Sequence, residues 1–112
     1  MIVIISSQGD TLESKPNPHF GRSPAFLSYD TDNDTWNAFD NPAVSEPGGA
    51  GVSASQFAVD HGASAIISGR FGPNTYHALK SAGIKMFIFN QSCDSVGDAI
   101  QAFKNNLLIP FV

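Results

Sequence analysis

The stretch Ile2-Val3-Ile4-Ile5-Ser6 decides the fold class of this 112-residue chain. It is short, β-branched and almost wholly apolar, which is typical of a strand buried on both faces. Polar residues and Gly9 follow it directly and end the run. We therefore predict a central strand at residues 2–6 and interpret the rest of the chain outward from it.

A β-hairpin is predicted after this strand and a long loop. The loop, Gln8 to Pro24, has no periodicity and contains several prolines, and compact domains usually keep a loop of this length for function. The aromatic-rich runs 25–30 and 35–40 flank Asp32-Asn33-Asp34, whose residues favour a turn. Within the second run, Trp36 and Ala38 share one face of the hairpin.

The remaining chain alternates helices with strands. The predicted elements are a helix at Ala50 to His61 ended by Gly62, a strand at Ala65 to Ile67, a helix from Pro73 that ends at Gly83, a strand at Ile84 to Phe89, and a helix capped by Ser95 and running to about Asn105. This order predicts one α/β domain over residues 1–112, in three layers, with a five-stranded mixed sheet flanked by helices.

Composition and charge exclude several classes of protein. One cysteine, Cys93, and three histidines cannot form a zinc site of four cysteines or of two cysteines and two histidines, nor a disulfide within one chain. The net charge of −4 argues against a protein that binds nucleic-acid backbones. The chain opens without a basic leader and has no apolar stretch of the roughly 20 residues that cross a membrane. We expect a soluble, cytoplasmic protein that binds neither nucleic acid nor membrane.

Four loops are expected to meet at one edge of the sheet. If the hairpin strands alternate in direction and right-handed crossovers keep the later strands parallel to the first, all four lie at carboxyl ends of strands or lead into helices. Ligands usually bind at that edge of an open α/β sheet. The loops are Gln8 to Pro24, Asn41 to Gly49 with its Pro42 and Pro47, Gly69 to Gly72, and Asn90 to Asp94. The acidic turn around Asp32 lies at the opposite edge.

Two glycine-rich helix starts in these loops indicate an anion site. Glycines in Gly48-Gly49-Ala50-Gly51 let backbone N–H groups approach a ligand, and the helix end adds partial positive charge. Gly69-Arg70-Phe71-Gly72 repeats this arrangement with a full charge, and Arg22 is expected nearby. Neither loop matches a nucleotide-binding fingerprint, and glycines that merely allow a tight helix entry are the alternative.

The histidines and the cysteine differ in what they predict. His19, between Pro18 and Gly21 on the long loop, can ligate or transfer protons, or simply bond the backbone. His61 is expected on the core-facing stripe of its helix and His77 on a helix surface, both with structural roles. Cys93 precedes a helix whose dipole favours a thiolate, although an inert thiol is the commoner case. No serine, histidine and acid are placed as a triad.

A series of motifs resembles the dinitrogenase iron-molybdenum cofactor biosynthesis family. The matching residues are His19-Phe20-Gly21-Arg22-Ser23-Pro24-Ala25-Phe26, Asn41-Pro42, Gly48-Gly49-Ala50-Gly51, Gly69, Gly72-Pro73-Asn74 and Ala82-Gly83-Ile84-Lys85. The resemblance implies a ribonuclease H-like fold without nuclease activity, in small proteins that bind or carry metal–sulfur clusters. It also implies a cofactor-binding role for His19, while Ser23 stands where nitrogenase-associated members carry cysteine.

The residues and the resemblance together predict non-catalytic binding or carriage of an anionic metal–sulfur cluster, of the iron–molybdenum type, or of its precursor. The predicted cofactor-binding residues, with His19 also as metal ligand, are His19, Gly21, Arg22, Gly49, Ala50, Gly51, Arg70 and Gly72. A cluster donor or acceptor protein is the implied partner. Binding of a phosphorylated metabolite and a protein-interaction role are the alternatives. The apolar tail 107–112 docks on its own core or on another subunit, so a monomer and a homodimer both stay open.

Overall fold

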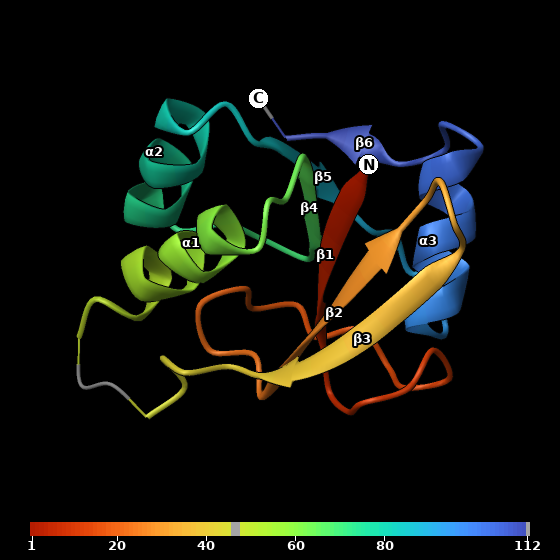
Figure 1. Cartoon of the computed structure of the whole chain (residues 1–112), viewed down its shortest axis with the longest axis horizontal. Coiled ribbons are helices and arrows are strands. Elements are labelled where there is room, and N and C mark those ends of the chain that lie inside the picture. Colours follow the sequence, from red (N-terminus) through yellow and green to blue (C-terminus); the bar gives the residue numbers. More distant parts are fainter. Residues whose placement is uncertain (46–47, 112) are drawn as a thin grey trace.

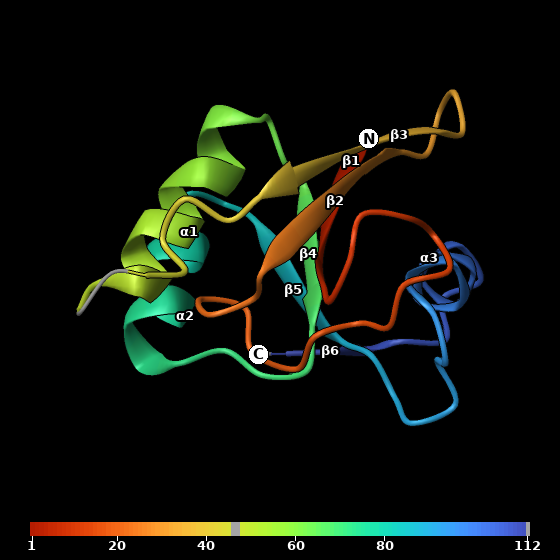
Figure 2. The same cartoon turned by 90° about the horizontal axis from the view of Figure 1, so that it is seen from below.

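A mixed sheet lies between two layers of helices in the computed structural model, which describes residues 1–45 and 48–111 (Figure 1). The elements are β1 (Ile2–Ser7), β2 (Ala25–Asp30), β3 (Thr35–Asp40), α1 (Ala50–Asp60), β4 (Ala65–Ser68), α2 (Pro73–Ser81), β5 (Lys85–Ile88), α3 (Val96–Lys104) and β6 (Ile109–Pro110). Helices α1 and α2 cover one face of the sheet and α3 covers the other (Figures 1 and 2).

The predicted strand directions are confirmed. The sheet order is β3-β2-β1-β4-β5-β6, which puts the apolar run at residues 2–6 in its interior. Strand β1 pairs antiparallel with β2 and parallel with β4, and β4 pairs parallel with β5. The hairpin β2–β3 is antiparallel, with the register Tyr29 opposite Trp36. The carboxyl ends of β1, β3, β4 and β5 therefore meet at one edge, as the sequence indicates.

The sheet of the described chain has six strands and not the predicted five. The additional strand, β6, comes from the apolar tail and pairs antiparallel with β5, with Ile88 opposite Ile109. The Phe111 N–H donates to the Met86 carbonyl over 2.9 Å, and the Phe111 ring packs on Phe71 with their centroids 5.4 Å apart. Leu108 and Phe111 thus pack on their own core, while Leu107 and Ile109 are exposed. Val112 lies outside the described residues, as does Pro47 of the predicted loop.

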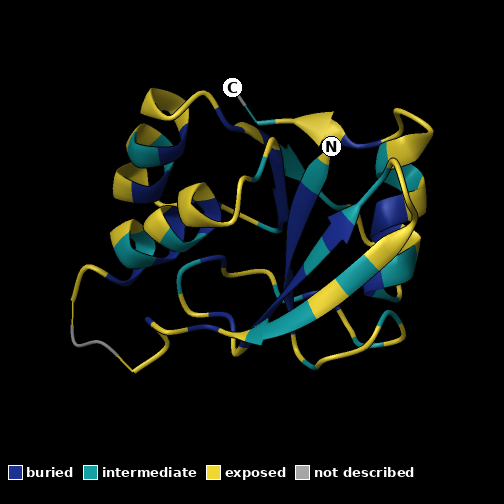
Figure 3. Cartoon of the chain, viewed as in Figure 1, coloured by how far each residue is buried: buried dark blue, intermediate teal, exposed yellow. Residues whose placement is uncertain are grey.

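Alternation along the strands divides the core between the two faces of the sheet. The interior strands β1 and β4 are buried along almost their whole length (Figure 3). Val3 and Ile5 of β1 face α3, together with Leu27, Ile67 and Ile100. The residues between them in β1 and in the other strands face α1 and α2; their cluster comprises Ile4, Phe20, Phe26, Ala54, Ala58, Ile66, Phe71, Leu79, Ile84 and Met86. A strand buried on both faces needs an apolar residue at nearly every position, which explains the uninterrupted run in β1.

The acidic turn between β2 and β3 joins three parts of the chain at the opposite edge. Asp32 accepts a 2.7 Å hydrogen bond from the Met1 ammonium, and Asp34 accepts one of 2.8 Å from Lys104 at the end of α3. The Lys104 ammonium is the main cause that holds the pKa of Asp34 below its ordinary value, with the Tyr29 hydroxyl as the second. The same bond raises the pKa of Lys104.

One predicted orientation is wrong. His61, placed by its spacing on the core-facing stripe of α1, is the exposed residue that ends this helix. Its ring lies over Phe57, with centroids 4.0 Å apart, and against Phe39. The His61 N–H still donates to the Phe57 carbonyl over 3.1 Å, so the residue keeps the helical spacing, but its side chain is exposed where the helix ends. His77 is exposed on α2, as predicted.

Candidate functional site

The long loop after β1 divides between the two faces of the sheet (Figure 2). Its first half runs beside α3, where the Ser14 and Leu12 carbonyls each accept a 2.8 Å hydrogen bond from the first residues of that helix. Its second half crosses to α1 and α2 and is anchored by Phe20, which is buried against Phe26 and Phe71. Only this second half, which carries His19 and Arg22, contributes to the candidate site.

Asn41 and Ser23 hold the second half of the loop in place. The Asn41 amide nitrogen donates to the carbonyls of Gly21 and Ser23 over 3.0 and 2.9 Å, and its oxygen accepts from the Ala43 N–H. The Ser23 hydroxyl accepts from the Ser7 N–H over 2.9 Å and is within 3.0 Å of the Ser7 carbonyl. Both side chains are buried, so they position the loop and do not face a ligand.

Loop 69–72 lies directly beside loop 17–22. His19 and Arg70 form a parallel β-bridge, and a Cβ atom at Gly69 would lie 2.6 Å from the Pro18 Cα. The Arg70 Nε donates to His19 Nδ1 over 2.9 Å, and Arg70 Nη2 lies 3.1 Å from His19 Nε2. A neutral imidazole has one acceptor nitrogen, so only one of these approaches is a hydrogen bond. The guanidinium therefore keeps donor capacity for a ligand.

The three helices begin in different ways. The first turn of α3 is fully capped, because Ser95 accepts from the Asp98 N–H and the long loop accepts from Val96 and Gly97. Helices α1 and α2 begin at Gly49 and Gly72, which have no side chain to cap with. Gly49 has φ 72°, a conformation that favours glycine. The first N–H groups of both helices thus point outward without a side-chain partner and carry partial positive charge.

Two adjoining cavities lie at these uncapped helix starts. The larger, about 440 Å³, is lined by His19, Phe20, Gly21, Arg22, Ala50, Gly51, Arg70, Phe71, Gly72 and Thr75. The smaller, about 210 Å³, is lined by Gly49, Ala50, Gly51, Val52, Gly72, Pro73, Asn74 and Thr75. The two share the beginning of α1 and of α2. Among the residues that the structure describes, no aspartate or glutamate lines either cavity.

All eight residues that the sequence predicted for binding line these cavities. Gly49 lines the smaller one and the other seven line the larger. Thr75, Phe20 and Phe71 are lining residues that the sequence reasoning missed. The sequence pattern assigns the two phenylalanines to the core, and they do pack there as well as lining the cavity. Thr75 lies inside a helical pattern, where its spacing from Gly72 is the only indication of a binding role.

Cys93 lies apart from this site. Its side chain is buried on the α3 face, where its thiol is 3.6 Å from the Asn90 amide oxygen. Its loop follows β5 at the predicted edge, but the side chain turns to the other side of the sheet. In the described ranges, no three histidine, cysteine, aspartate or glutamate side chains are grouped so that they could hold a metal ion. A metal-containing ligand would have to bring most of its own coordination.

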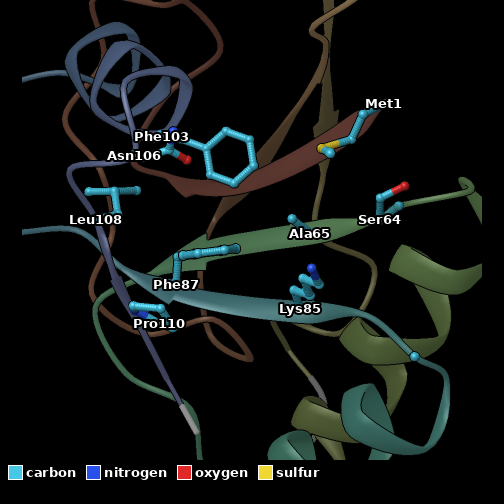
Figure 4. A pocket seen from close by; sticks show the side chains of 11 residues that line it. Met1, Ser64, Ala65, Lys85, Phe87, Phe103, Asn106, Leu108 and Pro110 are labelled. Atoms are coloured by element: carbon cyan, nitrogen blue, oxygen red, sulfur yellow. The ribbon is translucent and has the colours of Figure 1, made fainter.

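A third cavity, of about 640 Å³, lies at the opposite edge of the sheet (Figure 4). The apolar side chains Phe87, Phe103 and Leu108 line one part of it, and Lys85 and Ser64 line another. It contains the end of α3 and not the beginning of a helix. Its described lining includes Lys85 but no helix start, so it lacks the row of backbone N–H donors that the two cavities above present to an anion.

A family model described as "Dinitrogenase iron-molybdenum cofactor" matches residues 1–106. The chain belongs to this family. The resemblance carried by the loop and glycine motifs is thereby confirmed. Among curated protein sequences, none matches this family member. Within the described residues, no helix is both long and apolar enough to cross a membrane.

Two solved structures are similar to this family member over nearly its whole length. The apo form of the orange protein from Desulfovibrio gigas is 28% identical, with a TM-score of 0.93, and the match covers 99% of this chain and 92% of that one. A candidate NifB protein from Thermotoga is 29% identical, with a TM-score of 0.84, over 97% and 91% of the two chains. These likenesses support the α/β fold with its mixed sheet.

Proposed function

We propose that this protein binds and carries an anionic metal–sulfur cluster of the iron–molybdenum type, or its precursor, without catalysing a reaction. The cluster is cargo, held in the two adjoining cavities at the starts of α1 and α2. A cluster donor or acceptor protein would then be the physiological partner. The ribonuclease H-like character of the scaffold, without nuclease chemistry, is part of this proposal.

One observation carries the proposal: donors converge where the described lining has no carboxylate. Two uncapped helix ends supply amide N–H groups and partial positive charge, and Arg22 and Arg70 add two full charges at the larger cavity. The anionic side chains of the acidic turn lie at the other end of the sheet. Charge-assisted hydrogen bonds to such donors are roughly twice as strong as neutral ones. A negative net charge is thus compatible with anion binding.

The His19–Arg70 pair suggests how the ligand would be engaged. When Arg70 turns its guanidinium toward a bound anion, it leaves the imidazole and frees a ring nitrogen that can coordinate a metal of the cluster. His19 is exposed at the mouth of the cavity, so this exchange needs no rearrangement of the core. One protein ligand together with hydrogen bonds leaves the cluster transferable, whereas several thiolates would retain it.

Anaerobic titration with tetrathiomolybdate tests the charge of the site. Arg70→Gln is expected to weaken binding about tenfold or more, because a charge-assisted hydrogen bond contributes about 1.5–3 kcal/mol. The matched control is Lys15→Gln, which removes one positive charge from an exposed residue outside both cavities. Equal affinities of the two variants would contradict the proposed site, and no binding by the unmodified protein would contradict the function.

A second pair of variants tests the proposed ligand. His19→Ala should alter the absorption spectrum of the bound cluster and lower its affinity. His77→Ala removes an exposed histidine from the surface of α2 and should change neither. Identical spectra for the two complexes would remove His19 from the coordination sphere while leaving the anion site itself in place.

Binding of a phosphorylated metabolite is the second candidate function. Uncapped helix starts beside an arginine also suit a phosphate group. Such a ligand would yield colourless protein and binding that is insensitive to oxygen. The colour and metal content of protein purified without air therefore separate the two functions. The interaction role suggested by the apolar tail has less support, because its backbone pairs with β5 and its Leu108 side chain is buried, so that Leu107 and Ile109 are the large apolar side chains left exposed.

A further inference from the structure

Thr75, in the first turn of α2, carries a hydroxyl group that forms no hydrogen bond with the rest of the described structure. The residue is only 5% exposed, yet its hydroxyl has no hydrogen-bond partner among the residues that the structure describes. Its oxygen is open to solvent, since every enclosed side-chain oxygen or nitrogen among the described residues has a hydrogen-bond partner. Thr75 lines both cavities of the candidate site. Its hydroxyl is therefore available to a group that enters them.

The Thr75 hydroxyl lies where the two helices meet. A Cβ atom built on Gly51 would be 2.1 Å from Thr75 Oγ1, so this oxygen sits against the backbone of the first turn of α1. Only glycine at position 51 allows the approach. A donor carried by α2 thus reaches the beginning of α1, and the two helix starts are parts of one surface.

The amide donors around this hydroxyl are also unpaired. Within the described chain, the first N–H groups of α1 and α2 have no acceptor, in contrast to those of α3. They belong to Ala50, Gly51, Val52, Asn74 and Thr75. Both helices contribute residues to the lining of both cavities. An anion with acceptor atoms on several sides can satisfy both sets at once.

We propose that Thr75 is a specificity-determining residue whose O–H donates to a single polyatomic anion bridging the amino ends of α1 and α2. The ligand class is a compact anion with several peripheral acceptor atoms, terminated by sulfur, as in a thiometalate, or by oxygen, as in a phosphate group. This inference rests on the proposed anion-binding function and adds to it one donor and one geometry. The bound anion would join two helices that also contact each other directly, at Gly51 and Thr75 among other places.

The test compares Thr75→Ser with Thr75→Ala. Both variants remove the γ-methyl group and differ only in the hydroxyl, so a packing effect is common to them. Tetrathiomolybdate, without air, and inorganic phosphate are the two probes. We expect Thr75→Ser to bind within about twofold of the unmodified protein and Thr75→Ala to bind about tenfold more weakly. Equal affinities of the two variants for every probe that binds would overturn the assignment of Thr75.

Backbone amide NMR tests the bridge itself. The N–H signals of Gly51 and Thr75 should shift along one common saturation curve as the probe is added. Shifts confined to one helix, or two separate curves, would overturn the single bridging anion.

The outcomes separate this inference from the function on which it rests. If the unmodified protein binds neither probe, both the proposed function and this inference are wrong. If it binds phosphate alone, the metal–sulfur function fails and Thr75 is judged on phosphate. If it binds tetrathiomolybdate but the serine and alanine variants are alike, only the inference fails.

Discussion

At the scale of the residue, Ser23 occupies a position that the family motif suggests for a ligand, but its side chain forms hydrogen bonds with the backbone instead. It stands where the family resemblance places a cysteine, beside His19 in the same motif. Its side chain, however, is fully buried and hydrogen-bonded to the end of β1. The exchange of thiol for hydroxyl at position 23 therefore changes the anchoring of the loop and not the wall of the cavity.

Restoring the cysteine is expected to cost stability without improving binding. In Ser23→Cys a weaker acceptor replaces the one that the buried Ser7 N–H uses, so the free energy of unfolding should fall by about 1–3 kcal/mol. The introduced thiol should resist alkylation in the native protein, as should Cys93, which is also buried. Urea unfolding and mass-spectrometric labelling measure both effects. Tighter tetrathiomolybdate binding by this variant would show that position 23 reaches the ligand after all.

Asn41 is the residue whose loss should loosen the loop most. Asn41→Ala leaves the Gly21 and Ser23 carbonyls and the Ala43 N–H without their partner in a buried place. We expect a loss of about 1–3 kcal/mol in the free energy of unfolding, measured in urea. Asn37→Ala, an exposed asparagine on β3, is the control and should change it by less than about 0.5 kcal/mol. A similar loss in both variants would contradict the positioning role.

At the scale of the element, α1 begins so close to the long loop that a side chain at Gly21 would press on the backbone of the helix. A Cβ atom at Gly21 would lie 3.1 Å from the Gly51 nitrogen and from its Cα. It would cover an amide donor that faces the larger cavity. Close backbone approach, and not chain flexibility, is what these glycines provide.

Gly21→Ala should therefore weaken anion binding more than it weakens the fold. The added methyl group shields the Gly51 N–H, and we expect about tenfold lower affinity for tetrathiomolybdate or phosphate in calorimetric titration. Gly48→Ala is the matched control, because nothing lies within 4 Å of a Cβ atom at that exposed position. Unchanged affinity in Gly21→Ala would mean that the Gly51 amide is not a donor to the ligand.

Most elements could be predicted from the sequence because each has a local cause. Gly49 and Gly72 start helices, Ser95 caps α3, and alternation marks the hairpin. Strand β6 could not be predicted, since two residues that include Pro110 show no periodicity. It forms because the edge of β5 offers unpaired backbone groups and an apolar surface.

At the scale of the whole molecule, the acidic turn between β2 and β3 lies at the edge of the sheet opposite the candidate site. At that edge, Asp34 forms an ion pair with a lysine of α3, and Asp32 forms one with the amino terminus. The main cause that lowers the pKa of Asp30 is the hydrogen bond from the Asp32 backbone N–H. The main cause that lowers the pKa of Asp34 is the hydrogen bond from the Lys104 ammonium. Both carboxylates therefore favour the folded state only while they are ionised.

Stability should fall in acid for this reason. Because the pKa of Asp34 is below its ordinary 3.8 in the folded protein, its contribution is fully present above pH 3.8. It is lost as the pH falls from 3.8 through the lower folded value. Urea unfolding between pH 6 and about 2 should show a smaller acid dependence in Asp34→Asn than in Asp40→Asn, which removes an exposed carboxylate at the end of β3. Equal dependence in the two variants would contradict the role of the turn.

The sequence by itself determined the elements apart from β6, the strand directions and the eight residues at one edge. Hydrophobic spacing, glycine conformation and the hand of crossovers act locally or between neighbouring elements, so a single chain reveals them. Only the tertiary structure decided that Ser23 and Cys93 turn away, that Arg70 covers His19, and that Thr75 meets Gly51. These relations join residues distant in sequence through packing, and which side chain then faces a cavity depends on the neighbours that fill the space around it.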